Sequence, residues 1–156
     1  MENYIKSQTR LAFVQYIFQN EFSNTDILEG IEDFKKHFYN TDIAIIDEKK
    51  EFKLKFNKNF LNKLFYSFQN NIDKKIIIED LNRFIDINRK FEKWDKILKS
   101  IIFAIIAELL ITKKNKFKIV FNDYLNISKS LVSQKETKLI NAIIQKYIDK
   151  NEIIKK

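Results

Sequence analysis

The segment Ile-Ile-Phe-Ala-Ile-Ile-Ala-Glu-Leu-Leu-Ile, residues 101–111, decides the expected fold of this chain. It is apolar on every side of a helix except at Glu108, a pattern typical of a helix that other helices surround. A bilayer core needs about 20 consecutive apolar residues, so this run is too short to cross a membrane. The segment therefore predicts a buried central helix.

The residues on either side of this run predict further helices joined by short polar segments. In each helix, apolar residues recur three or four positions apart, which is the spacing of an amphipathic helix. The expected ranges are about 3–22, 26–39, 57–69, 73–85, 93–111, 117–131 and 134–150. Asn57 and Ser133 stand at helix N-cap positions, Asp73 begins the fourth helix, and Glu136 would complete a capping box with Ser133. The predicted fold class is all-α, with about seven helices in two packed helical bundles.

The composition supports helices and excludes several kinds of site. The 156 residues include no cysteine, no proline and one glycine, Gly30. This excludes disulfides, cysteine-bound zinc, a P-loop and a dinucleotide-binding glycine fingerprint. The length is that of one domain. We expect a single domain over residues 1–150, with subdomains of about 1–92 and 93–150 and a tail over 151–156.

Residues 40–56 are ambiguous in sequence. The segment from Glu51 to Phe56 alternates polar and apolar residues as a strand does. The segment from Asp42 to Ile46 could extend the second helix or form a short strand. Because one isolated strand has no partner in a helical protein, we interpret 51–56 as an extended linker.

The charge of the chain favours an anionic partner. The net charge is +8, but residues 1–50 carry six basic and nine acidic groups, so the positive excess lies in the last two thirds. Such an excess is most often found in proteins that bind nucleic acid. The start of the chain lacks the basic-then-apolar order of a signal peptide, so we expect a cytoplasmic protein with no membrane partner.

The residues do not favour catalysis. Glu108 lies alone in an apolar helix, where pairing with a basic residue or capping a neighbouring helix is a better interpretation than general acid catalysis. The single histidine, His37, lies near a helix end, where a cation is favoured. Ser128 and Ser130 lack a nucleophile turn. We therefore expect no enzyme activity, no metal and no cofactor.

Two helices near the C-terminus present polar faces that suit RNA. Lysines neutralise phosphates, and Asn or Gln side chains can hydrogen-bond to base edges or ribose hydroxyls. An ordinary solvated helix face remains the simpler alternative for each helix taken alone. The expected outer-face residues are Lys118, Asn122, Asn126 and Lys129 in one helix, and Lys138, Asn141 and Gln145 in the next.

The first helix offers a third candidate surface. Its expected RNA contacts are Lys6, Gln8, Arg10 and Gln15. Tyr16 and Phe18 are expected to contact a binding partner, for instance by stacking on unpaired bases. Because a Phe at helical spacing is more often part of the core, Tyr16 is the better candidate for exposure.

Five segments in the C-terminal half of the sequence follow one another in a recognisable order and spacing: Trp94–Ile97, Ile101–Leu109, Lys118–Asp123, Ser128–Lys129 and Lys138–Asn141. In this order they resemble the NusB family of bacterial transcription antitermination factors. The opening of the chain also resembles the family through Arg10, Val14, Gln15 and Phe18. The family's arginine-rich start is reduced here to Lys6 and Arg10. Its usual glycine after the final asparagine is Ala142.

The resemblance implies a two-bundle helical fold without an active site. It also implies binding of boxA-type RNA jointly with NusE, a small-subunit ribosomal protein. This pair would act in an RNA polymerase antitermination complex during ribosomal RNA transcription. The alternatives are a protein-interaction module with weak or lost RNA binding, and the helical domain of an RNA methyltransferase. The latter is disfavoured because no glycine-rich cofactor loop is present. Phe residues in the middle segment could serve a homodimer or fill the core.

Overall fold

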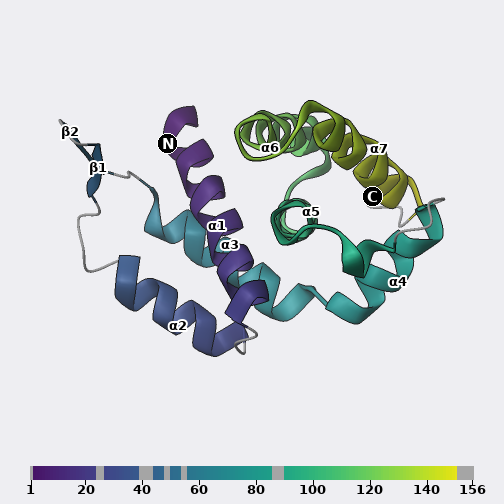
Figure 1. The fold of residues 1–156 in the computed structure, drawn as a ribbon, viewed down its shortest axis with the longest axis horizontal. Coiled ribbons are helices and arrows are strands. Elements are labelled where there is room, and N and C mark those ends of the chain that lie inside the picture. Colours follow the sequence, from purple (N-terminus) through teal and green to yellow (C-terminus); the bar gives the residue numbers. More distant parts are fainter. Residues whose placement is uncertain are drawn as a thin grey trace.

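The computed structural model describes residues 2–23, 27–38, 44–47, 50–53, 56–85 and 90–150. In these residues seven α-helices, two short 3-10 helices and one β-hairpin follow one another as Figure 1 shows. The α-helices are α1 (Asn3–Ser23), α2 (Ile27–Phe38), α3 (Lys58–Asn71), α4 (Lys74–Phe84), α5 (Lys96–Leu109), α6 (Phe117–Leu131) and α7 (Gln134–Lys150). The 3-10 helices are η1 (Phe91–Lys93) and η2 (Lys114–Lys116). The predicted all-α fold class is confirmed.

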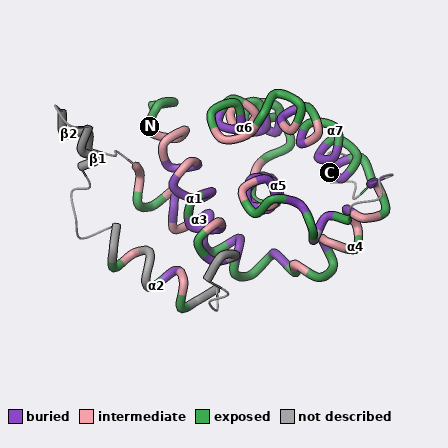
Figure 2. Tube along the Cα trace, viewed as in Figure 1, coloured by how far each residue is buried: buried purple, intermediate pink, exposed green. Residues whose placement is uncertain are grey.

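Helix α5 is the central element of the fold. It packs against α1, α3, α6 and α7, and every residue from Ser100 to Leu109 is buried. Helices α1, α2 and α3 lie on one side of α5, and α4, α6 and α7 lie on the other (Figure 1). Figure 2 shows that the outward-facing sides of α6 and α7 are exposed and that their inward-facing sides are buried. The predicted buried central helix is confirmed, whereas the predicted subdomain boundary near residue 92 stays a prediction.

The side chains predicted to cap helices do so. Asn57 Oδ1 accepts a hydrogen bond from the Phe60 amide at 2.8 Å. Asp73, which was predicted to begin the fourth helix, caps α4 in the same way. Ser133 Oγ accepts from the Glu136 amide at 3.1 Å, and Glu136 Oε1 accepts from the Ser133 amide at 3.1 Å. These contacts satisfy N–H groups that a helix start leaves unpaired, which is why the sequence located these helix starts closely.

Helix α5 is shorter than the predicted range of 93–111. The residues before it, Phe91–Lys93, form η1 instead, and Trp94 follows η1 in extended backbone. The Trp94 ring packs on the Phe91 ring at a centroid distance of 5.3 Å. Helix α5 therefore begins after Asp95 and not at residue 93, and the two packed aromatic rings lie just before it.

An aromatic cluster joins α1 to α3 and corrects one prediction. Tyr16 was expected to be exposed, but it is 1% exposed. Its ring lies 4.9 Å from Phe65 and 5.8 Å from Phe68, and Phe13 packs on the same two rings. The apolar face of α1 is therefore wide enough to include Tyr16, and these α3 phenylalanines fill the core. Tyr16 is not available to a partner in this structure.

The one glycine of the chain lies where α2 meets α1. A Cβ atom on Gly30 would lie 3.0 Å from Asn20 Nδ2 and 3.4 Å from the Tyr16 ring, so a larger residue would require these two side chains to shift by a few tenths of an ångström. Ile31, which follows, is buried as predicted. The other side chains predicted on the inner face of α2, and that of His37, lie outside the described residues.

A β-hairpin replaces the predicted linker. Strand β1 (Ala44–Asp47) pairs antiparallel with β2 (Lys50–Lys53), in the register Ala44 to Lys53 and Asp47 to Lys50. For residues 51–53 the strand pattern was therefore a correct signal, and the interpretation as an unpaired linker was wrong. Residues 54 and 55 lie outside the described residues. The partner is the apolar segment that could equally have extended the second helix. Cross-strand pairing supplies the hydrogen bonds that a lone strand would lack.

Candidate nucleic-acid interface

A groove of about 390 Å³ lies between α6 and α7. It is lined by Asn122, Leu125, Asn126 and Lys129 from α6 and by Thr137, Lys138 and Asn141 from α7. The three asparagines and two lysines are exposed to solvent. Within the described part of the chain, none of these five side chains takes part in a hydrogen bond or ion pair. Their polar groups are therefore available to a ligand.

Local sequence explains why the two helices present this groove. Only Val132 and Ser133 separate α6 from α7, and the capping box fixes the direction in which α7 starts. The inner faces of both helices bury apolar residues such as Tyr124 and Ile140 against α5 and against each other. Burial of these faces directs the Asn and Lys side chains at the intervening positions outward.

The chemistry of the groove suits a single-stranded polynucleotide. Lysine ammonium groups attract phosphates without selecting sequence, and each asparagine amide offers donors and acceptors for a base edge or a ribose hydroxyl. Leu125 adds a half-buried apolar surface between them. The groove is open rather than enclosed, so an extended chain could pass along it.

The structure brings together only some of the predicted RNA contacts. Asn122, Lys138 and Asn141 line the α6–α7 groove. Lys118 is exposed on the first turn of α6 but does not line it. Gln15 is exposed and Gln8 half-buried on α1, and neither lines this groove. Leu125 and Thr137 were missed, although each lies four residues from a predicted contact-face residue, Lys129 and Asn141 respectively.

Two further α1 side chains are also placed away from this groove. Lys6 is half-buried and lines a different groove, described below. Phe18 is half-buried on α1 and does not line the α6–α7 groove. The predicted partner contact of Phe18 stays a prediction.

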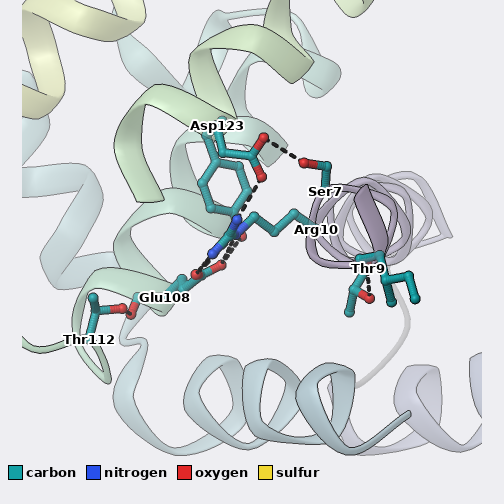
Figure 3. A network of polar contacts seen from close by, with 8 residues as sticks. Ser7, Thr9, Arg10, Glu108, Thr112 and Asp123 are labelled. Atoms are coloured by element: carbon teal, nitrogen blue, oxygen red, sulfur yellow. Dashed lines mark hydrogen bonds and ion pairs between the residues drawn. The ribbon is translucent and has the colours of Figure 1, made fainter. Parts of the chain in front are cut away.

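Arg10 is the predicted RNA contact that the structure corrects. Its side chain is 7% exposed and points into the protein, where α1, α5 and α6 meet (Figure 3). Arg10 Nη2 and Nε donate to the Glu108 carboxylate at 2.7–3.0 Å, and Nη1 donates to Asp123 Oδ2 at 2.6 Å. All three guanidinium nitrogens therefore have carboxylate partners, and Arg10 is not available to a phosphate.

Neighbouring side chains complete this ion network. Ser7 Oγ donates to Asp123 Oδ1 at 2.7 Å, and Tyr124 Oη donates to Glu108 Oε1 at 2.8 Å. Burial alone would lower the pKa of Arg10, but the hydrogen bonds and negative charge of Glu108, with help from Asp123, raise it above its ordinary value. The network accounts for the carboxylate within the apolar central helix: Glu108 pairs with a basic residue, as predicted from the sequence.

Tyr124 gives a testable pH dependence. Burial, followed by the negative charge of Glu108, raises the pKa of Tyr124 well above its ordinary value. A pKa raised in the folded state gives stability that is full below the unfolded pKa, about 10, and is lost as the pH rises through the folded pKa. We expect the free energy of unfolding in urea to fall above about pH 10 and to fall less steeply in Tyr124→Phe.

Two comparisons sharpen this test. Burial also raises the pKa of Tyr147, so Tyr124→Phe should reduce the alkaline loss of stability without abolishing it. Tyr66→Phe changes a ring that is 66% exposed and should leave the alkaline loss as in the parent protein. Equal pH dependence in Tyr124→Phe and the parent protein would contradict the role assigned to the buried ring.

Other kinds of site receive no support from the described residues. In this part of the chain, no group of three or more His, Cys, Asp or Glu side chains could hold a metal ion. None of the described helices combines the length and the apolar character that crossing a membrane requires. The candidate site is therefore the open surface between two helices.

The fold and the groove together define an all-α protein with a cationic, amide-rich surface groove. The chain matches the NusB family over residues 7–149. It is 26% identical over 141 residues to the proteins named "Transcription antitermination protein NusB" from Rickettsia conorii and Rickettsia massiliae, covering 90% of this chain and 89% of each relative. It is 25% identical over 149 residues to the protein of that name from Rickettsia felis, covering 96% and 94%. The chain belongs to the NusB family.

Proposed function

We propose that this chain is a transcription antitermination factor that binds boxA-type single-stranded RNA together with NusE. It would act in an RNA polymerase antitermination complex during ribosomal RNA transcription. The observation that carries the proposal is the α6–α7 groove, where Lys129 and Lys138 lie beside three asparagines whose amides have no partner within the described residues. Membership in the NusB family supports the same assignment.

The composition of the groove supports recognition of RNA bases rather than charge attraction alone. Sequence-specific RNA binding usually depends on unpaired bases whose edges are open to hydrogen bonding. Asn122, Asn126 and Asn141 offer such hydrogen bonds within one groove between the helices. The two lysines would hold the backbone in place while the amides read the bases.

A second candidate function is a protein-interaction module with weak or lost RNA binding. The internal position of Arg10 favours it, since α1 then contributes fewer cations to an RNA surface. In this alternative the chain would bind NusE tightly and bind boxA and scrambled RNA equally weakly. A homodimer is a further possibility for which sedimentation analysis provides the test.

We also propose that the protein acts in the cytoplasm by binding alone, without a cofactor or a catalytic step. Its described residues pair the one carboxylate of the central helix with Arg10, which leaves Glu108 unsuited to proton transfer. Calorimetry should detect no binding of S-adenosylmethionine. Clear binding would support the methyltransferase-domain alternative instead.

The direct test is fluorescence anisotropy with labelled boxA-type RNA and a scrambled RNA of equal composition, each with and without NusE. We expect tighter binding of boxA RNA, and a further gain when NusE is present. The dissociation constant should rise steeply with salt, with a logarithmic slope of about 0.7 per phosphate contact on a single strand. Equal affinity for both RNAs in both conditions would refute the proposal.

A further inference from the structure

A second groove of about 390 Å³ lies on another side of α6, where the start of α1, α3 and the end of α5 meet. It is lined by Lys6, Arg10, Phe60, Lys63, Glu108, Ile111, Thr112, Lys113, Lys116 and Val120. It shares no lining residue with the α6–α7 groove. We call it the lysine groove.

The lysine groove combines positive charge with an apolar floor. Within the described part of the chain, its four lysines form no ion pair. Its one carboxylate, Glu108, is already neutralised by Arg10 at 2.7 Å. Ile111 is 42% exposed among these lysines. Covering a large apolar side chain and removing it from water is favourable. An anionic ligand that also has an apolar part would match both features.

The lining disfavours nucleic acid as this ligand. No asparagine or glutamine lines the groove. The Phe60 ring already packs against the Arg10 guanidinium, with 5.4 Å between the guanidinium carbon and the ring centroid. The Thr112 hydroxyl donates to the Glu108 carbonyl oxygen at 2.6 Å. The groups that would stack on bases or hydrogen-bond to them are therefore absent or engaged, in contrast to the α6–α7 groove.

We propose that the lysine groove docks an acidic segment of a partner protein. The segment inserts an apolar side chain against Ile111 and Val120, and its carboxylates lie beside the lysines around them. Charge complementarity of this kind sets orientation and speeds association, while the apolar anchor supplies much of the affinity. This surface is separate from the proposed RNA groove, so the protein can hold RNA and an acidic protein segment at once.

The test uses a fluorescein-labelled peptide of repeated Leu-Glu-Glu units and anisotropy with the full chain. We expect the protein to bind this peptide more tightly than a Ser-Glu-Glu peptide of the same length. The variant Lys63→Glu/Lys113→Glu should bind it about tenfold more weakly, since reversed charges repel the carboxylates. Ile111→Ser should also weaken binding, because it removes the apolar contact.

The matched control is Lys75→Glu/Lys90→Glu, which makes the same change of charge at exposed lysines outside the groove. It should bind the Leu-Glu-Glu peptide almost as the parent protein does. Equal weakening in both double variants, or equal binding of the two peptides, would overturn the proposal. If labelled oligouridylate binding is lost in Lys63→Glu/Lys113→Glu and kept in the control, the groove binds RNA instead, which overturns it too. These outcomes are independent of boxA binding at the α6–α7 groove.

Discussion

Replacing Arg10 by Ala should lower the free energy of unfolding by about 3–5 kcal/mol, because it leaves a buried carboxylate without its partner. The Arg10 and Glu108 side chains are 7% and 3% exposed, so the Glu108 carboxylate depends mainly on protein groups for its hydrogen bonds. The network also ties α1 to α5 and α6 through one side chain. Urea unfolding followed by circular dichroism measures the loss.

The control is an ion pair on the surface. Arg83 lies 3.2 Å from Asp80 within α4, and its side chain is 59% exposed. Arg83→Ala should cost at most about 0.5 kcal/mol, since water screens such a pair. The double variant Arg10→Met/Glu108→Met should cost less than the sum of the two single variants, because the two charges are removed together. An Arg10→Ala cost no larger than that of Arg83→Ala would contradict the assigned structural role.

The second large effect is expected on RNA affinity. Lys129→Glu/Lys138→Glu should weaken binding of boxA-type RNA by about two orders of magnitude, since each lost phosphate contact is worth about 1.5 kcal/mol and 1.4 kcal/mol is tenfold. The milder variant Lys129→Ala/Lys138→Ala should reduce the salt slope by about 1.4, which is about 0.7 for each phosphate contact removed. Anisotropy over a range of salt concentrations gives both values.

The same control as above, Lys75→Glu/Lys90→Glu, isolates position from net charge. It lowers the charge of the protein equally but lies on α4 and before η1, away from the α6–α7 groove. We expect it to retain RNA affinity within about threefold, the loss being long-range electrostatics alone. If it loses as much affinity as Lys129→Glu/Lys138→Glu, RNA binding depends on overall charge and not on this groove.

The sequence predicted α6 and α7 to the residue, and the reason is local. Their apolar residues repeat at helical spacing, and Ser133 with Glu136 marks the start of α7 by a contact within one turn. The outward direction of Asn122, Lys138 and Asn141 followed from the same periodicity. Properties fixed within about one helical turn can be read from sequence.

Arg10 shows what could not be predicted in this way. Its partners, Glu108 and Asp123, are 98 and 113 positions away, and no local pattern places the three together. From sequence alone, a basic residue near the chain start is predicted to be exposed to solvent. Only the packing of α1 against α5 shows that it is buried. A single carboxylate in an apolar helix was the available signal, because a buried charge requires a partner.

The prediction of an unpaired linker within residues 40–56 was wrong for a related reason. A strand is stabilised by a partner that the pattern of one segment does not identify, whereas a helix satisfies its own backbone hydrogen bonds. The segment containing Ala44 to Asp47 fitted a helix extension as well as a strand, so the partner of Lys50–Lys53 was overlooked. The groove between α6 and α7 could not be predicted from the sequence either, because its width depends on how the two helices pack.

The central claim is that RNA lies in the α6–α7 groove, and the side-chain amides of its asparagines report on this directly. Titration of the isotope-labelled protein with boxA-type RNA, followed by nuclear magnetic resonance, should shift the amide signals of Asn122, Asn126 and Asn141. The signal of Asn70, an exposed residue of α3 whose amide donates to the Tyr66 carbonyl oxygen at 2.9 Å, should stay in place. Saturating RNA that leaves the three groove amides unshifted would contradict the account.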